Sequence, residues 1–125
     1  MAEGPHAAGS LRRLTKRAQF LNAARGARAG RTGFSLQAIE VADAEPGFGL
    51  TVTNKTGNSP ERNRIRRRLR AAVRACGGAF RAQHDYVLVG RREALTLPFA
   101  RVVADLSSAI EKVHARARDT GSQRP

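Results

Sequence analysis

The segment from Thr56 to Arg74, TGNSPERNRIRRRLRAAVR, constrains the fold more than any other part of the chain. Ser59 can cap a helix, Pro60 suits its first position, and Glu61 favours the positive end of the helix dipole. Gly77-Gly78 can end the helix. At about 100° per residue, one arc of this helix collects the apolar residues Ile65, Leu69, Ala72, Val73 and Cys76. Such an arc has to cover another element, and we expect that element to be a sheet.

The flanking segments predict the sheet and two further helices. Residues 11–25 carry apolar residues at helical spacing, and Gly26 and Gly30 follow as stop signals. Residues 31–41 and 48–53 alternate apolar and polar residues around the turn AEPG, which predicts a hairpin of at least two strands. The apolar run 86–89 predicts another strand. After Pro98, one helical face collects Phe99, Val102, Val103, Leu106, Ile110 and Val113. This order predicts an α/β sandwich, with helices packed on a small sheet.

The length and the ends of the chain suit one domain. The 125 residues, 41% of them hydrophobic, suffice for a single core. We expect a domain over residues 11–118, with disordered polar tails at 1–10 and 119–125. No apolar run approaches the roughly 18 residues that span a bilayer, and the first residues do not form a secretory signal. A single cysteine, Cys76, excludes an intrachain disulfide. A cytoplasmic protein with no membrane partner is expected.

The charge balance predicts a polyanionic partner. Lys and Arg number 23 against 10 Asp and Glu, so the formal net charge is +13. Opposite the apolar arc of the predicted helix lie Asn63, Arg67, Arg70 and Arg74, flanked by Arg64 and Arg66, with Arg62 and Arg68 nearer the apolar edges. Like charges at Arg66/Arg70 and Arg70/Arg74 repel at a spacing of four, and no acid follows Glu61 within the helix. Ordinary solvated faces mix signs, so phosphate binding explains this face better than solvation does.

A second basic region precedes the predicted strands, and no catalytic pattern accompanies either one. No acidic residue occurs between residues 4 and 39, which contain Arg12, Arg13, Lys16, Arg17, Arg25, Arg28 and Arg31. The three histidines, His6, His84 and His114, share no spacing typical of a metal site or a catalytic base. Cys76 falls on the apolar arc, where a packing role is expected. We therefore predict no catalytic residue and no metal site in the polypeptide.

Residues 49–74, GLTVTNKTGNSPERNRIRRRLRAAVR, resemble the signature region of the protein subunit of bacterial ribonuclease P. Arg62-Asn63-Arg64 stands where that family has its Arg-Asn-Arg triplet. Leu14-Thr15-Lys16 with Phe20 resembles the family's opening, and residues 85–89 resemble its last strand, so the resemblance covers roughly residues 11–115. It implies an αβββαβα fold in a two-layer sandwich with a small mixed sheet, similar to a domain of a ribosomal protein and of elongation factor G. It also implies an atypical left-handed crossover around the arginine helix.

The same resemblance implies a function. Proteins of this family bind a large catalytic RNA, and the holoenzyme is an endoribonuclease that removes the 5′ leader of precursor tRNA. The chemistry is implied to come from Mg²⁺ held with the RNA subunit, the polypeptide alone binding no cofactor. Contacts to the catalytic RNA are implied for Lys55, Gly57, Arg62, Asn63, Arg64, Arg66, Arg67, Arg68, Arg70 and Arg74.

A cleft between the sheet and the first helix is implied to hold the single-stranded leader. The implied lining residues are Phe20, Phe34, Lys16, Arg17 and Arg13. Core packing explains Phe20 and Phe34 equally well. Ala24 and Gln37 stand where the family often has aromatic residues, so this chain departs from the family's stacking residues at both positions.

Two other classes of function are compatible with the composition. A structural RNA-binding protein, such as a ribosomal or ribosome-assembly protein, would carry the same charge, and only the Arg-Asn-Arg block favours ribonuclease P over it. A DNA-binding protein would place the arginine helix in a major groove. Beyond Asn63, however, that helix offers little variety for reading bases, which suits phosphate contacts more than sequence readout.

Overall fold

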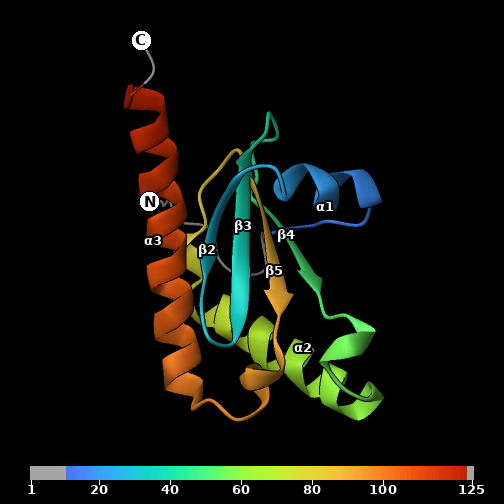
Figure 1. Cartoon of the computed structure of the whole chain (residues 1–125). Coiled ribbons are helices and arrows are strands. Elements are labelled where there is room, and N and C mark those ends of the chain that lie inside the picture. The colour runs from blue at the N-terminus through green and yellow to red at the C-terminus, as the bar shows by residue number, and fades with distance from the viewer. Residues whose placement is uncertain (1–10, 124–125) are drawn as a thin grey trace.

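The computed structural model describes the backbone of residues 11–123 and the side chains of residues 11–115. Within this range the chain forms a five-stranded mixed sheet with helices on both faces (Figure 1). In chain order the elements are β1 (Arg12–Arg13), α1 (Arg17–Ala23), β2 (Ala27–Gly30), β3 (Phe34–Glu40), β4 (Gly47–Thr51), the short 3₁₀ helix η2 (Asn54–Thr56), α2 (Ser59–Ala75), η3 (Gly77–Ala79), β5 (His84–Gly90), η4 (Arg92–Leu95) and α3 (Phe99–Gln123). The predicted α/β class is confirmed.

The order of the strands places α2 in an unusual connection. The sheet runs β1-β4-β5-β3-β2, and β3 pairs antiparallel with both β2 and β5. In contrast, β4 pairs parallel with β5 and with β1. The chain therefore leaves β4, passes through α2 and returns as the neighbouring parallel strand. Figure 1 shows β4 and β5 pointing the same way with α2 behind the sheet, so this crossover is left-handed, against the usual rule.

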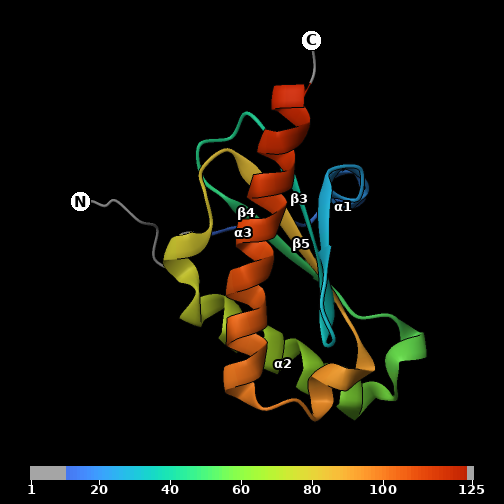
Figure 2. The same cartoon turned by 60° about the vertical axis from the view of Figure 1, so that its left-hand side comes forward.

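The two faces of the sheet carry different cores. The larger core lies between the sheet and α2 with α3, and Phe34, Leu36, Leu69, Leu88 and Leu106 are among its fully buried members. A smaller core lies under α1, where Leu14, Ala23 and Val87 are buried, with Phe20, Ile39 and Val89 packed against them. Figure 2 shows α1 on one side of the sheet and α2 on the other. The left-handed crossover thus leaves one face of α2 against the core and the opposite face open.

The predicted hairpin of residues 31–41 and 48–53 is wrong. Both segments contain strands, β3 and β4, but β5 lies between them in the sheet and pairs with each. Alternation identifies the face that a strand buries and carries no information about its partner. β2 was not predicted from periodicity, because its sequence ARAG lacks large apolar residues. It completes the three strands between α1 and α2 that the family resemblance implied, and β1 before α1 is an additional strand.

The ends of the predicted helices also shift. The segment 11–25 starts with the strand β1, and its helix spans only Arg17–Ala23. The cap of α2 is Asn58 in place of Ser59. Phe99 is 42% exposed and lies off the buried face of α3. The helix α3 continues past residue 118 and ends at Gln123. The predicted tail at residues 1–10 lies outside the described residues.

Candidate nucleic-acid interface

The N-terminus of α2 is held by a capping box. The Asn58 side chain accepts a hydrogen bond from the Glu61 N–H at 2.9 Å, and Glu61 Oε1 accepts one from the Asn58 N–H at 2.9 Å. Farther along the helix, Ile65, Leu69 and Val73 are buried in the main core, as the helical periodicity predicted. Because this face of α2 is buried, the side chains on the opposite face of the helix point toward solvent.

Four arginines of α2 form its outer face, which we call the open arginines. They are all exposed, and none makes a hydrogen bond or an ion pair with another described residue. The open arginines are Arg64, Arg67, Arg70 and Arg74. Asn63 is exposed beside them, and its Oδ1 accepts a hydrogen bond from Arg66 Nη1 at 3.1 Å. Unpaired guanidinium groups on one surface are suited to binding phosphate oxygens.

The other arginines of α2 bind the protein's own backbone. Arg62 Nη1 donates to the carbonyl oxygen of Gly57 at 2.7 Å. Arg68 Nε donates to the carbonyl oxygen of Ala94 at 2.8 Å, and its Nη2 donates to that of Leu97. The guanidinium of Arg68 thus faces the η4 segment and joins that segment to α2, whereas the open arginines face solvent.

The segment between β4 and α2 adds one exposed cation. Lys55 lies in η2 and is exposed, at the same end of the molecule as the start of α2. Gly57 has an extended backbone, and its carbonyl oxygen accepts the bond from Arg62. A Cβ on Gly57 would lie 2.5 Å from Glu61 Oε1, so only glycine fits this close approach. Gly57 thus contacts Arg62 of the Arg-Asn-Arg triplet, and Lys55 lies two residues before Gly57 in the chain.

A groove of about 520 Å³ opens beside the edge of β4 and connects the two basic regions. One wall is the C-terminal half of α2, and the other is formed by residues around β1 and α1. Its lining residues are Leu11, Arg12, Arg13, Leu14, Phe20, Phe48, Gly49, Leu50, Arg70, Val73 and Arg74. Apolar side chains and arginines therefore meet in one hollow, and none of its lining residues in the described part of the chain is acidic.

Only part of the implied leader cleft comes together in this groove. Phe20 and Arg13 line it, whereas Lys16 and Arg17 are exposed at the start of α1 without lining it. Phe34 needs correction, because it is 1% exposed in the main core, while α1 covers the other face of the sheet. Phe48 and Leu50 are lining residues that sequence reasoning missed. Their alternation with glycine predicted a strand, but nothing in it indicated an open edge.

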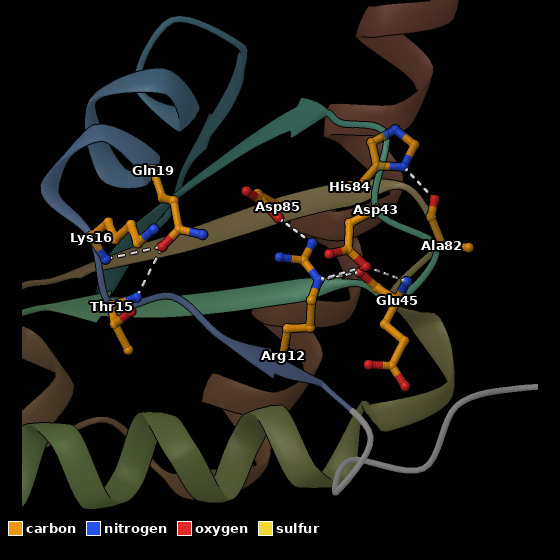
Figure 3. A network of polar contacts seen from close by, with 9 residues as sticks. All are labelled: Arg12, Thr15, Lys16, Gln19, Asp43, Glu45, Ala82, His84 and Asp85. Atoms are coloured by element: carbon orange, nitrogen blue, oxygen red, sulfur yellow. Dashed lines mark hydrogen bonds and ion pairs between the residues drawn. The ribbon is translucent and has the colours of Figure 1, made fainter.

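The wall of the groove at β1 contains a partly buried ion pair (Figure 3). Arg12 Nη2 lies 2.5 Å from Asp85 Oδ1, and Arg12 Nε donates to the carbonyl oxygen of Glu45 at 2.8 Å. Arg12 Nε also lies 3.2 Å from Asp43 Oδ1. The charge of Arg12 is thus neutralised internally. Arg13, the next residue of β1, is exposed and remains available to a ligand.

Neither a metal centre nor a membrane span is found in the described part of the chain. Among residues 11–115, no group of three or more His, Cys, Asp or Glu side chains is placed to hold a metal ion. Among residues 11–123, no helix combines the length and the apolar composition that crossing a membrane requires. Burial raises the pKa of the Cys76 thiol, which favours the unreactive protonated form.

Comparisons with known proteins agree on one family. The family model of Ribonuclease P matches residues 9–114. The ribonuclease P protein component of Brucella suis is 40% identical over 108 residues, covering 78% of this chain and 77% of that protein. The component of Gluconacetobacter diazotrophicus is 42% identical over 110 residues, covering 86% of this chain and 95% of that protein.

Solved structures show the same fold. The RNase P protein from Thermotoga maritima superposes with a TM-score of 0.67 at 24% identity, covering 77% of this chain and 92% of that chain. The RNase P protein of Staphylococcus aureus gives a TM-score of 0.66 at 22% identity, covering 79% of this chain and 92% of that chain.

Proposed function

The chain belongs to the ribonuclease P protein family, and we propose that it binds the RNA subunit of this enzyme together with the 5′ leader of precursor tRNA. In this proposal the RNA subunit and its Mg²⁺ cleave the phosphodiester bond, and the polypeptide binds and positions the two RNAs in the cytoplasm. The observation that carries the proposal is the outer face of α2, where none of the four open arginines makes a hydrogen bond or an ion pair with a described residue.

The open arginines support binding to folded RNA through phosphates. Free in solution, Arg70 repels Arg74 one turn away, and a bound phosphate removes that repulsion. Bidentate guanidinium–phosphate hydrogen bonds add direct attraction. Each neutralised phosphate also releases condensed counterions, so the affinity falls steeply as salt rises. Asn63 adds a neutral side chain with donors and an acceptor at the centre of the positive surface.

The groove beside β4 supports binding of a single strand. Its floor offers the partly buried apolar side chains Phe20, Phe48 and Leu50, on which an unpaired base can lie. Stacking on an aromatic ring contributes about 1–3 kcal/mol per base. Arg13 on one wall and Arg70 on the other are placed for the phosphates on either side of such a base. We therefore propose this groove as the leader site, with Phe20 and Arg13 retained from the sequence prediction and Phe34 excluded.

Reconstitution tests the proposal directly. The protein is mixed with a bacterial ribonuclease P RNA at low Mg²⁺, and cleavage of a precursor tRNA at its 5′ leader is measured. We expect the protein to stimulate cleavage over RNA alone. Equal rates with and without protein would overturn the proposal.

A matched pair of variants separates the α2 surface from net charge. Arg67→Ala with Arg70→Ala removes two of the open arginines and is expected to weaken RNA binding and flatten its salt dependence. Arg101→Ala with Lys112→Ala removes the same charge from exposed positions of α3. The α3 variant is expected to bind within about threefold of wild type, as distant exposed charges are largely screened. Equal losses in both variants would assign the binding to net charge alone.

A further inference from the structure

The arginine helix α2 carries one acidic residue, Glu61. Its carboxylate accepts hydrogen bonds from the Asn58 N–H and from Arg92. Glu61 is the only acidic residue between Glu45 and Asp85 in the sequence. Arg92 Nη1 donates to Glu61 Oε1 at 3.0 Å, and Arg92 Nη2 donates to Glu61 Oε2 at 2.8 Å. Arg92 follows β5 and opens η4, so this bidentate pair joins segments that lie 31 residues apart.

Arg92 also binds the segment that leads into α2. Its Nη1 donates to the carbonyl oxygen of Thr56 at 3.2 Å. Between these two contacts lies Gly57, where an added Cβ would come within 2.5 Å of Glu61 Oε1 and 2.9 Å of Arg92 Nη1. One guanidinium therefore closes over the chain between η2 and α2. We call the contacts among Arg92, Glu61 and Thr56 the clamp.

Stability alone does not account for the clamp. The side chains of Arg92 and Glu61 are 59% and 30% exposed, and ion pairs of that kind contribute little to folding. The hydrogen bond from Arg92 lowers the pKa of Glu61 to about 2, so the carboxylate stays charged even well below neutral pH. A permanent negative charge next to the open arginine Arg64 works against phosphate binding. Its presence is explained if the shape that the clamp imposes outweighs that repulsion.

We propose that Arg92 is a positioning residue, whose contacts with Glu61 and Thr56 hold residues 54–58 against the first turn of α2 and so present Lys55 and the Arg-Asn-Arg triplet to RNA. This inference rests on the proposed function. In this proposal Glu61 supports RNA binding by positioning the surface, although its negative charge repels RNA phosphates. Arg92 lies outside the residues that the family signature singled out.

Substitution of Glu61 distinguishes the positioning role of the clamp from a simple effect of charge. Loss of the clamp predicts weaker RNA binding, whereas removal of a negative charge predicts tighter RNA binding. Glu61→Gln keeps a residue suited to the capping box but loses the ion pair with Arg92. It also makes the protein more positive by one charge. Glu93→Gln is the matched control, since Glu93 is exposed in η4 and its side chain makes no hydrogen bond or ion pair with a described residue. Electrostatics alone predicts that both variants bind ribonuclease P RNA slightly more tightly.

We expect Glu93→Gln to bind ribonuclease P RNA at least as tightly as wild type, and Glu61→Gln to bind it roughly threefold to tenfold more weakly. Thermal unfolding is expected to be nearly the same for the two variants. Glu61→Gln binding as tightly as Glu93→Gln would overturn the inference.

Arg92→Lys provides a second arm in which the net charge does not change. A lysine keeps the positive charge but lacks the planar fork that reaches both carboxylate oxygens and the Thr56 carbonyl. We expect Arg92→Lys to weaken RNA binding to about the same extent as Glu61→Gln. Wild-type affinity in Arg92→Lys, with a loss in Arg92→Gln, would assign the effect to the charge of Arg92 and overturn the clamp.

Hydrogen exchange tests the clamp in the free protein, without RNA. It therefore distinguishes a failure of the clamp proposal from a failure of the proposed function. In the free protein, the amides of residues 54–58 are expected to exchange faster in Glu61→Gln than in Glu93→Gln. Unchanged exchange would show that the clamp does not hold this segment. If exchange changes as expected but wild type fails to bind ribonuclease P RNA, the proposed function is refuted and the clamp remains as a structural contact.

Discussion

Arg67 and Arg68 are adjacent in the sequence, yet an alanine substitution at one is expected to lower RNA affinity and at the other to lower stability. Each substitution removes one positive charge from α2. Arg67 is exposed and belongs to the open arginines, with no hydrogen bond or ion pair to a described residue. Arg68 is half-buried and donates to the carbonyl oxygens of Ala94 and Leu97. Loss of Arg68 should therefore affect folding, and loss of Arg67 should affect RNA binding.

The contacts of Arg68 set the size of the first effect. A hydrogen bond with a charged donor contributes about 1.5–3 kcal/mol when buried. Both acceptors lie in a part-buried region, so water can partly replace the lost donor. We therefore expect Arg68→Ala to lower the free energy of unfolding by about 2 kcal/mol in total. For a chain of 125 residues, this corresponds to a fall in Tm of roughly 8 °C. Arg67→Ala should stay within about 0.5 kcal/mol of wild type.

Two measurements on each variant separate the roles. Urea unfolding gives the stability, and titration of ribonuclease P RNA at several salt concentrations gives the slope of log K against log salt. Arg67→Ala is expected to reduce that slope by about one, the effect of losing one phosphate contact. Arg68→Ala is expected to keep the wild-type slope under conditions where it is folded. The reasoning fails if Arg68→Ala is as stable as wild type and loses slope, because Arg68 would then contact RNA.

Three further predictions concern the core, the groove and the thiol. Tyr86→Phe removes the hydroxyl that lies 2.6 Å from His114 Nε2 and should cost about 1 kcal/mol of stability in urea unfolding at neutral pH. Burial raises the pKa of Tyr86 from 10.0 to about 12, so its contribution is present below pH 10 and is lost as pH rises toward 12; the variant should lose less stability across that window than wild type. Gly49→Ala should weaken binding of single-stranded leader RNA without changing charge, because the new Cβ would lie 2.7 Å from the ring of Phe20; unchanged leader affinity would remove Phe20 from the site. Cys76 should react with a thiol reagent at pH 8 more slowly in the folded protein than in urea, since burial raises its pKa; equal rates would contradict that burial.

The elements with a strong period were predictable from the sequence. The apolar arc of residues 65–76 indicated a helix on a sheet, and α2 buries Ile65, Leu69 and Val73 as expected. The pairing of strands was not predictable, because the hydrophobic alternation of β3 and β4 is satisfied with any neighbour that covers the same face. Only the family resemblance indicated the three strands between α1 and α2 and the left-handed crossover, since both depend on contacts across the whole sheet.

The candidate site shows the same limit at the level of single side chains. The helical wheel correctly separated the outer face of α2 from its buried face, because the period of a helix is fixed by its backbone geometry. It placed Arg68 near the apolar edge but carried no information on what lies beyond that edge. The acceptors of Arg68 are backbone carbonyls 26 and 29 residues away, in a segment whose own sequence shows no sign of this contact. Whether Phe34 packs in the main core or lines the cleft was not predictable for a related reason, since alternation does not say which face of the sheet α1 covers.

The η4 segment explains why a count of arginines overstates the surface available to RNA. Arg68 of α2 binds the carbonyl oxygens of Ala94 in η4 and of Leu97 just after it, while Arg92 of η4 binds Glu61 in α2 and Thr56 in η2. An arginine of α2 thus donates toward η4, and an arginine of η4 donates toward α2. Together these contacts hold η4 against the side of α2. A phosphate that recruited Arg68 would have to replace two carbonyl acceptors, whereas one that binds Arg67 displaces only water. The open arginines should therefore be occupied first, and the inward-facing ones should set the orientation in which α2 meets its RNA.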